Sequence, residues 1–108
     1  MYTKIAVNYL NNFSKKNIRD ISAVVSDSVT LRDWDADVVG KKKVLEFMQE
    51  LFDNVDTISV DIYKTYEVDQ TVLIEMEILI DGNISLLVTD IIDFNNNNLI
   101  ESIRAYLG

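Results

Sequence analysis

The amino-acid sequence predicts an α+β fold in which a curved antiparallel sheet carries three N-terminal helices packed on its concave face. The hydrophobic residues recur with a helical period in the first half of the chain and with a period of two from Thr57 onward. Helical segments therefore come first and long strands follow, an order typical of α+β proteins. The 108 residues are enough for one core, so we expect residues 1–108 to form one domain.

Two helices are predicted at the start of the chain. Apolar side chains recur at helical spacing over residues 2–13, which indicates an amphipathic first helix. Asn17 is a suitable N-cap for a short second helix. The inward-facing residues of that helix would run as far as Val24 and Val25, and Asp27 and Ser28 would end it.

A short strand over residues 29–33 and a loop over residues 34–39 are expected next. Gly40 then opens the third helix. Its apolar stripe has the spacing of a buried helix face and consists of Val44, Phe47, Met48, Leu51 and Phe52.

Four long antiparallel strands fill the remainder of the chain. Alternating apolar and polar residues predict strands over residues 57–68, 71–80 and 84–94 and near the C-terminus. Asp81-Gly82-Asn83 is a hairpin signal, and residues 95–98, all asparagine, form the last turn.

The composition limits the chemistry that is available. There are 18 acidic and 10 basic residues, a net charge of −8, which argues against nucleic acid or anionic membrane surfaces as partners. The absence of cysteine and histidine excludes thiol chemistry and Cys/His metal sites and leaves only oxygen-ligand sites for hard cations. We expect neither a metal nor another cofactor. No signal peptide or membrane-spanning run is present, so we expect a cytoplasmic protein.

Asp90 is the most informative residue of the sequence. It shares one face of its strand with Leu86, Val88, Ile92 and Phe94, all of which are apolar. An ionised carboxylate on such a face is costly to bury, so Asp90 must be paired, protonated or turned outward by a bulge.

The order of elements resembles the NTF2-like (cystatin-like) superfamily, which includes SnoaL-like cyclases and Δ5-3-ketosteroid isomerases. YLNNFSKKNIRDISAVVSDSVTLRD, from Tyr9 to Asp33, is similar to the isomerase stretch between the catalytic tyrosine and the catalytic aspartate. DIIDFNNNNLIESIRAYLG, from Asp90 onward, is similar to the segment that begins with the second catalytic aspartate. The chain departs from the isomerases in carrying Trp34 after Asp33, in a loop that is shorter.

The resemblance implies a role for each of three residues. Asp33 would be the base that removes a proton from the carbon next to a carbonyl, while Tyr9 and a protonated Asp90 would hydrogen-bond the enolate oxygen. Structural roles are open for all three: Tyr9 lies on a helical core stripe, Asp33 can start a turn, and Asp90 can be turned outward. Trp34 is either part of the pocket rim or a packing residue.

The pocket of such a cone would be mainly apolar. Its predicted ligand-binding residues, besides Tyr9, Asp33 and Asp90, are Phe13, Leu31, Trp34, Phe47, Leu51, Ile74, Met76, Val88, Ile92, Ile103, Ala105 and Leu107. We expect a small hydrophobic molecule, such as a ketone, to bind there.

The other face of the sheet is also apolar, so we expect a homodimer through this convex face. Its predicted members are Leu87, Thr89, Ile91, Ile100 and Tyr106.

Three classes of function remain open on the sequence alone. The first is an enzyme that moves a proton α to a carbonyl, by isomerisation or by SnoaL-like ring closure. The second is a binding protein for a small hydrophobic molecule without catalysis. The third is a protein–protein module like the superfamily's transport factors, which would gain nothing from a buried carboxylate.

Overall fold

The structure is a computed structural model that describes residues 1–108, with three helices and six strands. The helices are α1 (Tyr2–Ser14), α2 (Ile18–Ser22) and α3 (Lys41–Asn54). The strands are β1 (Val25–Arg32), β2 (Asp37–Val39), β3 (Ile58–Val68), β4 (Thr71–Ile80), β5 (Ile84–Phe94) and β6 (Ile100–Leu107). None of the helices is long and apolar enough to span a membrane.

The two long helices use the apolar stripes predicted for them. In α1 the buried residues are Ala6, Tyr9 and Leu10, and in α3 they are Val44, Met48 and Phe52. Gly40 precedes α3 with a φ of 96°, a left-handed conformation that glycine adopts without steric cost. The apolar spacing and the glycine together fix where α3 begins and which face it buries.

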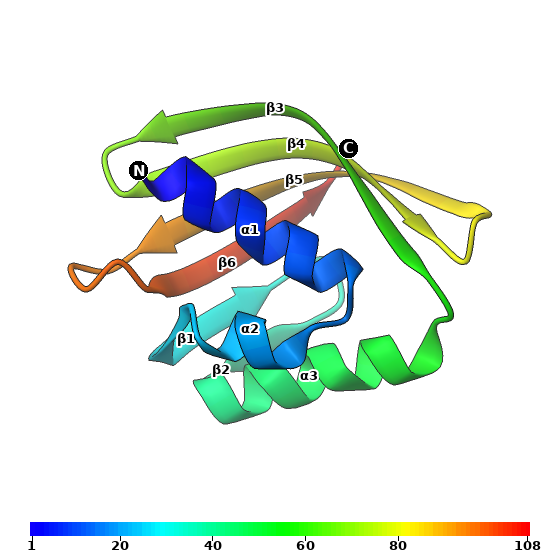
Figure 1. The fold of residues 1–108 in the computed structure, drawn as a ribbon, viewed down its shortest axis with the longest axis horizontal. Helices are drawn as coiled ribbons and strands as arrows, with labels where there is room; N and C mark the ends of the chain where they lie inside the picture. The colour runs from blue at the N-terminus through cyan, green and yellow to red at the C-terminus, as the bar shows by residue number, and fades with distance from the viewer.

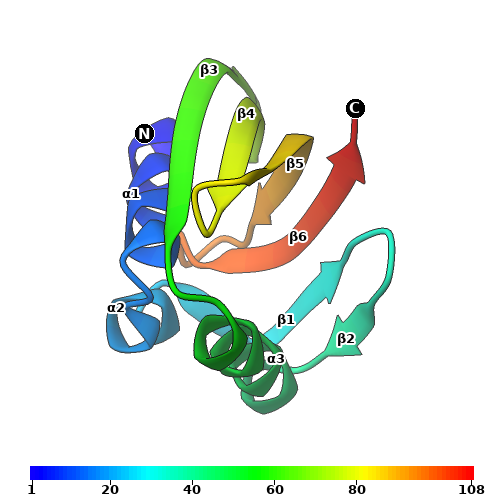
Figure 2. The same cartoon turned by 90° about the vertical axis from the view of Figure 1, so that its right-hand side faces the viewer.

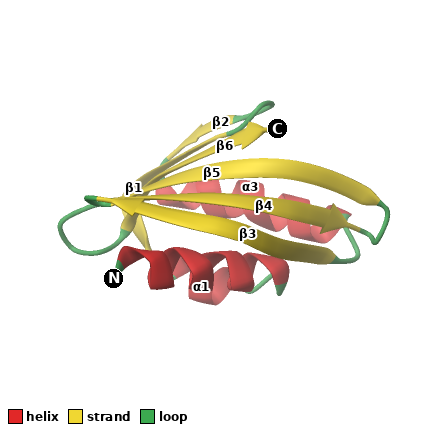
Figure 3. Ribbon diagram, turned by 90° about the horizontal axis from the view of Figure 1, so that it is seen from above, coloured by secondary structure: helices red, strands yellow, loops and turns green.

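The six strands form one sheet in the order β2-β1-β6-β5-β4-β3. The predicted α+β class is confirmed, but the sheet is mixed rather than wholly antiparallel because β1 and β6 run parallel. The other four pairs are antiparallel, including the predicted β3–β4 and β4–β5 hairpins. Figure 3 shows α1 and α3 on the same side of this sheet, which is its concave side.

The boundary between α2 and β1 differs from the sequence prediction. Val24 and Val25 were expected in the second helix, but α2 ends at Ser22 and β1 begins at Val25. Both valines are β-branched, and Val25 gains a strand partner in Ile100 of β6. The predicted loop over residues 34–39 likewise contains the short strand β2, which pairs with β1.

A bulge near the start of β6 changes which face its first residue occupies. Asp93 pairs with Ser102, whereas Phe94 pairs with Ile100, so Glu101 is an extra residue. Ile100, predicted on the convex face, is therefore fully buried in the core on the concave side. The Glu101 carboxylate accepts hydrogen bonds from the hydroxyls of Ser26 and Ser28 in β1, both at 2.6 Å.

The helices divide the concave face between them. α1 packs against β3 and β4, α3 packs against β1 and β2, and α2 contacts both long helices. In Figure 1, α1 and α3 run toward the right, the side on which the β4–β5 hairpin lies. Figure 2 looks into this open end of the cone, and the β5–β6 loop marks the opposite, packed end.

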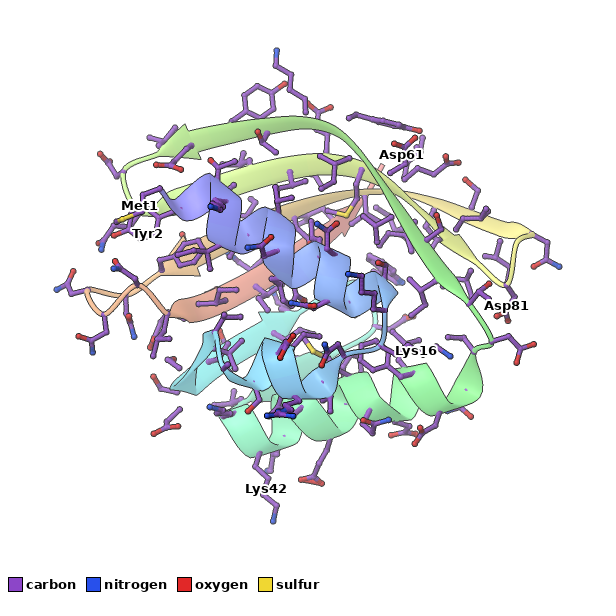
Figure 4. All side chains as sticks on the ribbon, in the orientation of Figure 1. Met1, Tyr2, Lys16, Lys42, Asp61 and Asp81 are labelled. Atoms are coloured by element: carbon purple, nitrogen blue, oxygen red, sulfur yellow. The ribbon has the colours of Figure 1, made fainter.

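Two side chains hold the segment that leads from α3 into β3 at the open end. The Lys16 ammonium group donates to the carbonyls of Val55 and Asp56. Asp81, in the β4–β5 hairpin, accepts from the backbone N–H groups of Asp56 and Thr57 at 2.6 and 3.0 Å. Figure 4 shows Lys16 and Asp81 on this side of the molecule.

Candidate functional site

The open end of the cone contains a cavity of about 160 Å³, and its lining is almost entirely apolar. Asp90 is the only acidic residue in that lining, and no basic residue takes part. The lining residues are Tyr9, Leu10, Phe13, Leu31, Trp34, Phe47, Met48, Leu51, Ile58, Ile78, Ile80, Leu86, Val88, Asp90, Ile103 and Ala105.

Asp90 occupies the middle of the sheet, on the cavity side. In β5 it lies between Ile74 of β4 and Ala105 of β6, and only 6% of its surface is exposed. Burial, and secondarily the negative charge of Asp33, raise the pKa of the Asp90 carboxyl from 3.8 to about 7. The carboxyl group thus takes up a proton far more readily than an ordinary aspartate near neutral pH.

Tyr9 faces the same cavity from α1. It is 3% exposed, and its ring packs near that of Phe13, with 6.3 Å between the ring centres. Burial and the neighbouring charge of Asp90 raise the pKa of its hydroxyl, so Tyr9 stays protonated and can donate a hydrogen bond.

The oxygens of Tyr9 and Asp90 are available to a bound molecule. No fully enclosed polar side-chain atom of the chain lacks a hydrogen-bond partner. The hydrogen bonds of the chain involve neither of these two side chains, so their oxygens reach the space of the cavity. Both oxygens therefore lie in a largely apolar surrounding.

Asp33 lies immediately after β1, where its carboxylate organises a turn. One carboxylate oxygen, Oδ1, accepts from the backbone N–H groups of Asp35 and Ala36, both at 2.8 Å. Asp33 is half-buried and does not line the cavity, but its charge is felt by Asp90. The next residue, Trp34, is 43% exposed and does line the cavity.

The structure brings together ten of the residues predicted for the pocket, and five, Asp33 among them, do not line it. Those that line the cavity are Tyr9, Asp90, Phe13, Leu31, Trp34, Phe47, Leu51, Val88, Ile103 and Ala105. Ile74, Met76 and Ile92 face the same side of the sheet but are enclosed in the core. Leu107 also shares that face, yet it is near the end of β6 and is 48% exposed.

Six lining residues were not singled out from the sequence: Leu10, Met48, Ile58, Ile78, Ile80 and Leu86. All six belong to apolar faces that the sequence pattern predicts, so alternation and helical spacing could have nominated them. The pattern does not distinguish a core position from a cavity position, because both are occupied by large apolar side chains. No cluster of three acidic side chains is placed to hold a metal ion.

The curved mixed sheet with helices on its concave face and a cavity at the open end is the NTF2-like fold. The sequence profile of the SnoaL-like domain family matches residues 6–103. The chain therefore belongs to the SnoaL-like domain family. A comparison with curated proteins found no match.

Solved structures support the fold assignment at low sequence identity. A Shewanella denitrificans protein assigned as a SnoaL-like polyketide cyclase has a TM-score of 0.89, 12% identity, and coverage of 99% of this chain and 90% of that one. A Kribbella flavida protein assigned as a ketosteroid isomerase has a TM-score of 0.86 and 11% identity, with coverage of 99% of this chain and 77% of that one. An LEH-like epoxide hydrolase of M. tuberculosis has a TM-score of 0.85 and 15% identity, with coverage of 99% of this chain and 82% of that one. At these identities the comparisons establish the fold alone.

Proposed function

We propose that the protein binds a small, largely apolar carbonyl compound and moves a proton from the carbon next to the carbonyl to another carbon of the conjugated system, as in an allylic isomerisation. The observation that carries the proposal is the placement of Asp90, a carboxyl with a pKa of about 7, beside Tyr9 in an otherwise apolar cavity. An apolar site containing a carboxylic acid is suited to stabilising negative charge that develops on a substrate oxygen.

Tyr9 and protonated Asp90 are the proposed donors to the carbonyl oxygen. Removing a proton from the neighbouring carbon turns that oxygen into an enolate, and hydrogen bonds to it strengthen as the charge develops. A low-dielectric surrounding increases the effect of each donor. This role requires Asp90 to carry its proton, so activity should decline above about pH 7 as the carboxyl ionises.

Asp33 is the proposed base. Its Oδ1 is held by the two backbone N–H groups of the turn, which orients the carboxylate and leaves Oδ2 to accept a proton. Its charge acts on Asp90, and its neighbour Trp34 lines the cavity, so the group lies close to the site without being part of its wall. The base would then approach the substrate from the side of Trp34.

The test is an absorbance assay for conjugation with a panel of β,γ-unsaturated ketones of different size. Wild type should form the conjugated product. Asp33→Asn should lower the rate about 10²- to 10⁴-fold because the base is lost. Asp90→Leu should lower it about 10²- to 10³-fold because one donor is lost.

The matched control for this assay is Asp35→Asn, which neutralises a neighbouring exposed carboxylate that is not part of the cavity lining. This variant should retain the wild-type rate. Equal rates for Asp33→Asn and wild type on a ketone that is turned over would remove Asp33 from the mechanism.

A second candidate function is binding of a small hydrophobic molecule without catalysis. The observation in its favour is that Asp33 is absent from the cavity wall and has one oxygen engaged in a turn. Calorimetric binding of a ketone with no turnover of any β,γ-unsaturated analogue would favour this second function.

We also propose that the protein forms a homodimer through the convex face of the sheet. Leu87, Tyr106, Tyr66 and Val68 are large apolar or aromatic side chains exposed on this face or at its edge. Sedimentation at micromolar concentration should give twice the mass of 12.4 kDa, and Leu87→Lys should shift the protein to monomer. A wild-type monomer at that concentration would exclude the dimer.

A further inference from the structure

We propose that the cavity is selective for neutral carbonyl compounds of about one ring, and that it excludes fused-ring ketones and anionic ligands. The inference rests on the proposed function only in directing the ligand oxygen to Tyr9 and Asp90. It concerns the size and charge of what binds, not whether the bound molecule reacts.

The volume of the cavity sets the size limit. A dry engineered cavity of about 150 Å³ binds a single benzene ring, whereas sites for drug-sized ligands enclose roughly 300–1,000 Å³. At about 160 Å³, the cavity of this protein matches the one-ring case. A tetracyclic ketone would have to leave most of its rings in solvent.

The walls of the cavity are fixed by packing, so they resist enlargement. On the helix side, the Phe13 ring meets the Phe52 ring edge-on, with 5.2 Å between their centres. Met48 and Leu10 also line the cavity, yet they are 1% and 2% exposed because their other sides belong to the core. Moving such side chains to admit a second ring would disrupt close packing, which is costly.

Charge sets the second limit. No Lys or Arg lines the cavity, and the acidic groups nearest to a ligand are Asp90 in the wall and Asp33 beside it. A carboxylate or phosphate would have no cationic partner, would lose its hydration in an apolar cavity and would be repelled by the Asp33 carboxylate. A neutral ketone instead accepts hydrogen bonds from Tyr9 and protonated Asp90.

The two ends of the cavity give the ligand an orientation. Asp90 is nearly enclosed, whereas Trp34 is almost half exposed and marks the mouth. The oxygen therefore points inward and the ring lies toward Trp34. Trp34 is the only tryptophan of the chain, so its fluorescence reports directly on occupancy of the mouth.

The experiment titrates the full-length protein calorimetrically and by Trp34 fluorescence with cyclohexanone, 1-decalone, a saturated tetracyclic 3-ketosteroid and cyclohexanecarboxylate. We expect cyclohexanone to bind at least tenfold more tightly than the other three at pH 6. Equal or tighter binding of the tetracyclic ketone or the carboxylate would overturn the inference. Failure of cyclohexanone to bind would overturn it as well.

Two leucines of α3 provide a matched pair of variants. Leu51 lines the cavity, whereas Leu45 is similarly half-buried on the same helix but lies outside it. Leu51→Ala should improve binding of 1-decalone at least tenfold, and Leu45→Ala should leave the order of affinities unchanged. The wild-type series decides the question by itself if either variant fails to fold.

The size limit and the proposed isomerase function can fail independently, and the experiments distinguish the two failures. Binding of cyclohexanone without turnover of any unsaturated ketone supports the size limit and removes the isomerase. Turnover of a tetracyclic ketone with tight binding supports the isomerase and removes the size limit.

Discussion

The packed end and the open end of the cone are built from the same strands but are filled differently. At the packed end, Val72, Ile74 and Ile92 are fully buried, and the rings of Tyr2 and Phe94 lie 4.8 Å apart. Further along β4 and β5, residues of the same face remain half-buried and line a cavity. The difference shows that alternation determines which face turns inward, while the helices above decide whether that face is packed or left open.

The largest expected difference between the two ends is in the free energy of unfolding lost when a large side chain is replaced by alanine. Ile92→Ala, in the fully buried part, should reduce the free energy of unfolding by about 3 to 5 kcal/mol. Leu51→Ala should cost only about 1 to 2 kcal/mol, since Leu51 is half-buried and already borders open space. Urea unfolding measures both, and equal losses would contradict the comparison.

Asp90 should make stability depend on pH in the direction opposite to that of carboxylates that are ion-paired or hydrogen-bonded in the folded state. Its pKa is about 7 when folded and near 3.8 when unfolded, so the folded state binds the extra proton between these values. Its contribution to stability therefore falls as pH rises through this window, by about 2 to 3 kcal/mol between roughly pH 5 and pH 8.

Urea unfolding of wild type and Asp90→Asn at both pH values tests this slope. The variant lacks the titrating group, so its stability relative to wild type should improve at the higher pH. Parallel pH profiles for the two proteins would contradict a raised pKa for Asp90.

The turn at Asp33 allows its structural and electrostatic roles to be separated. Asp33→Ala removes the acceptor for two backbone N–H groups and should cost about 1 to 2 kcal/mol. Asp33→Asn retains an acceptor oxygen and should cost less. Both variants remove a negative charge, so NMR titration should show a lower pKa for Asp90 in each. An unchanged Asp90 pKa would place Asp33 too far away to act on the site.

The smallest expected effect on stability is that of a substitution at Lys16, at the rim of the open end. Its ammonium group donates to the carbonyls of Val55 and Asp56, so Lys16→Met should cost about 1 kcal/mol. Methionine retains a long unbranched side chain on a backbone whose φ is 58°. Lys15→Met, at an exposed neighbour, should be neutral in the same thermal unfolding assay. Equal losses would indicate that the Lys16 contacts contribute nothing.

The sequence was most informative where a residue broke a regular pattern. Asp90 stood out because strand alternation placed a carboxylic acid on an apolar face, and the structure puts it on the concave side with its surface nearly all enclosed. The helix stripes and long strands were equally predictable, because their periods differ. The functional roles of Tyr9, Asp33 and Asp90 remain predictions.

The sequence pattern does not predict the place of a residue when a single inserted residue or a partner far along the chain decides it. The single extra residue at Glu101 turns Ile100 into the core, and strict alternation from Ile103 backward assigns Ile100 to the wrong face because it does not allow for that residue. Val25 joins a strand only because Ile100 lies beside it. The cavity itself depends on how far helices and sheet stand apart, which side-chain hydrophobicity does not encode.

The parallel pairing of β1 with β6 also governs the order in which the molecule can assemble. Ser26 and Glu101, joined across this pair, are 75 positions apart, so their meeting closes a long loop. The β3–β4 and β4–β5 hairpins need no such closure and can form early. Leu31 and Trp34 reach the cavity only once β1 has docked. We therefore expect ligand binding to be acquired late in refolding, after most of the sheet has formed.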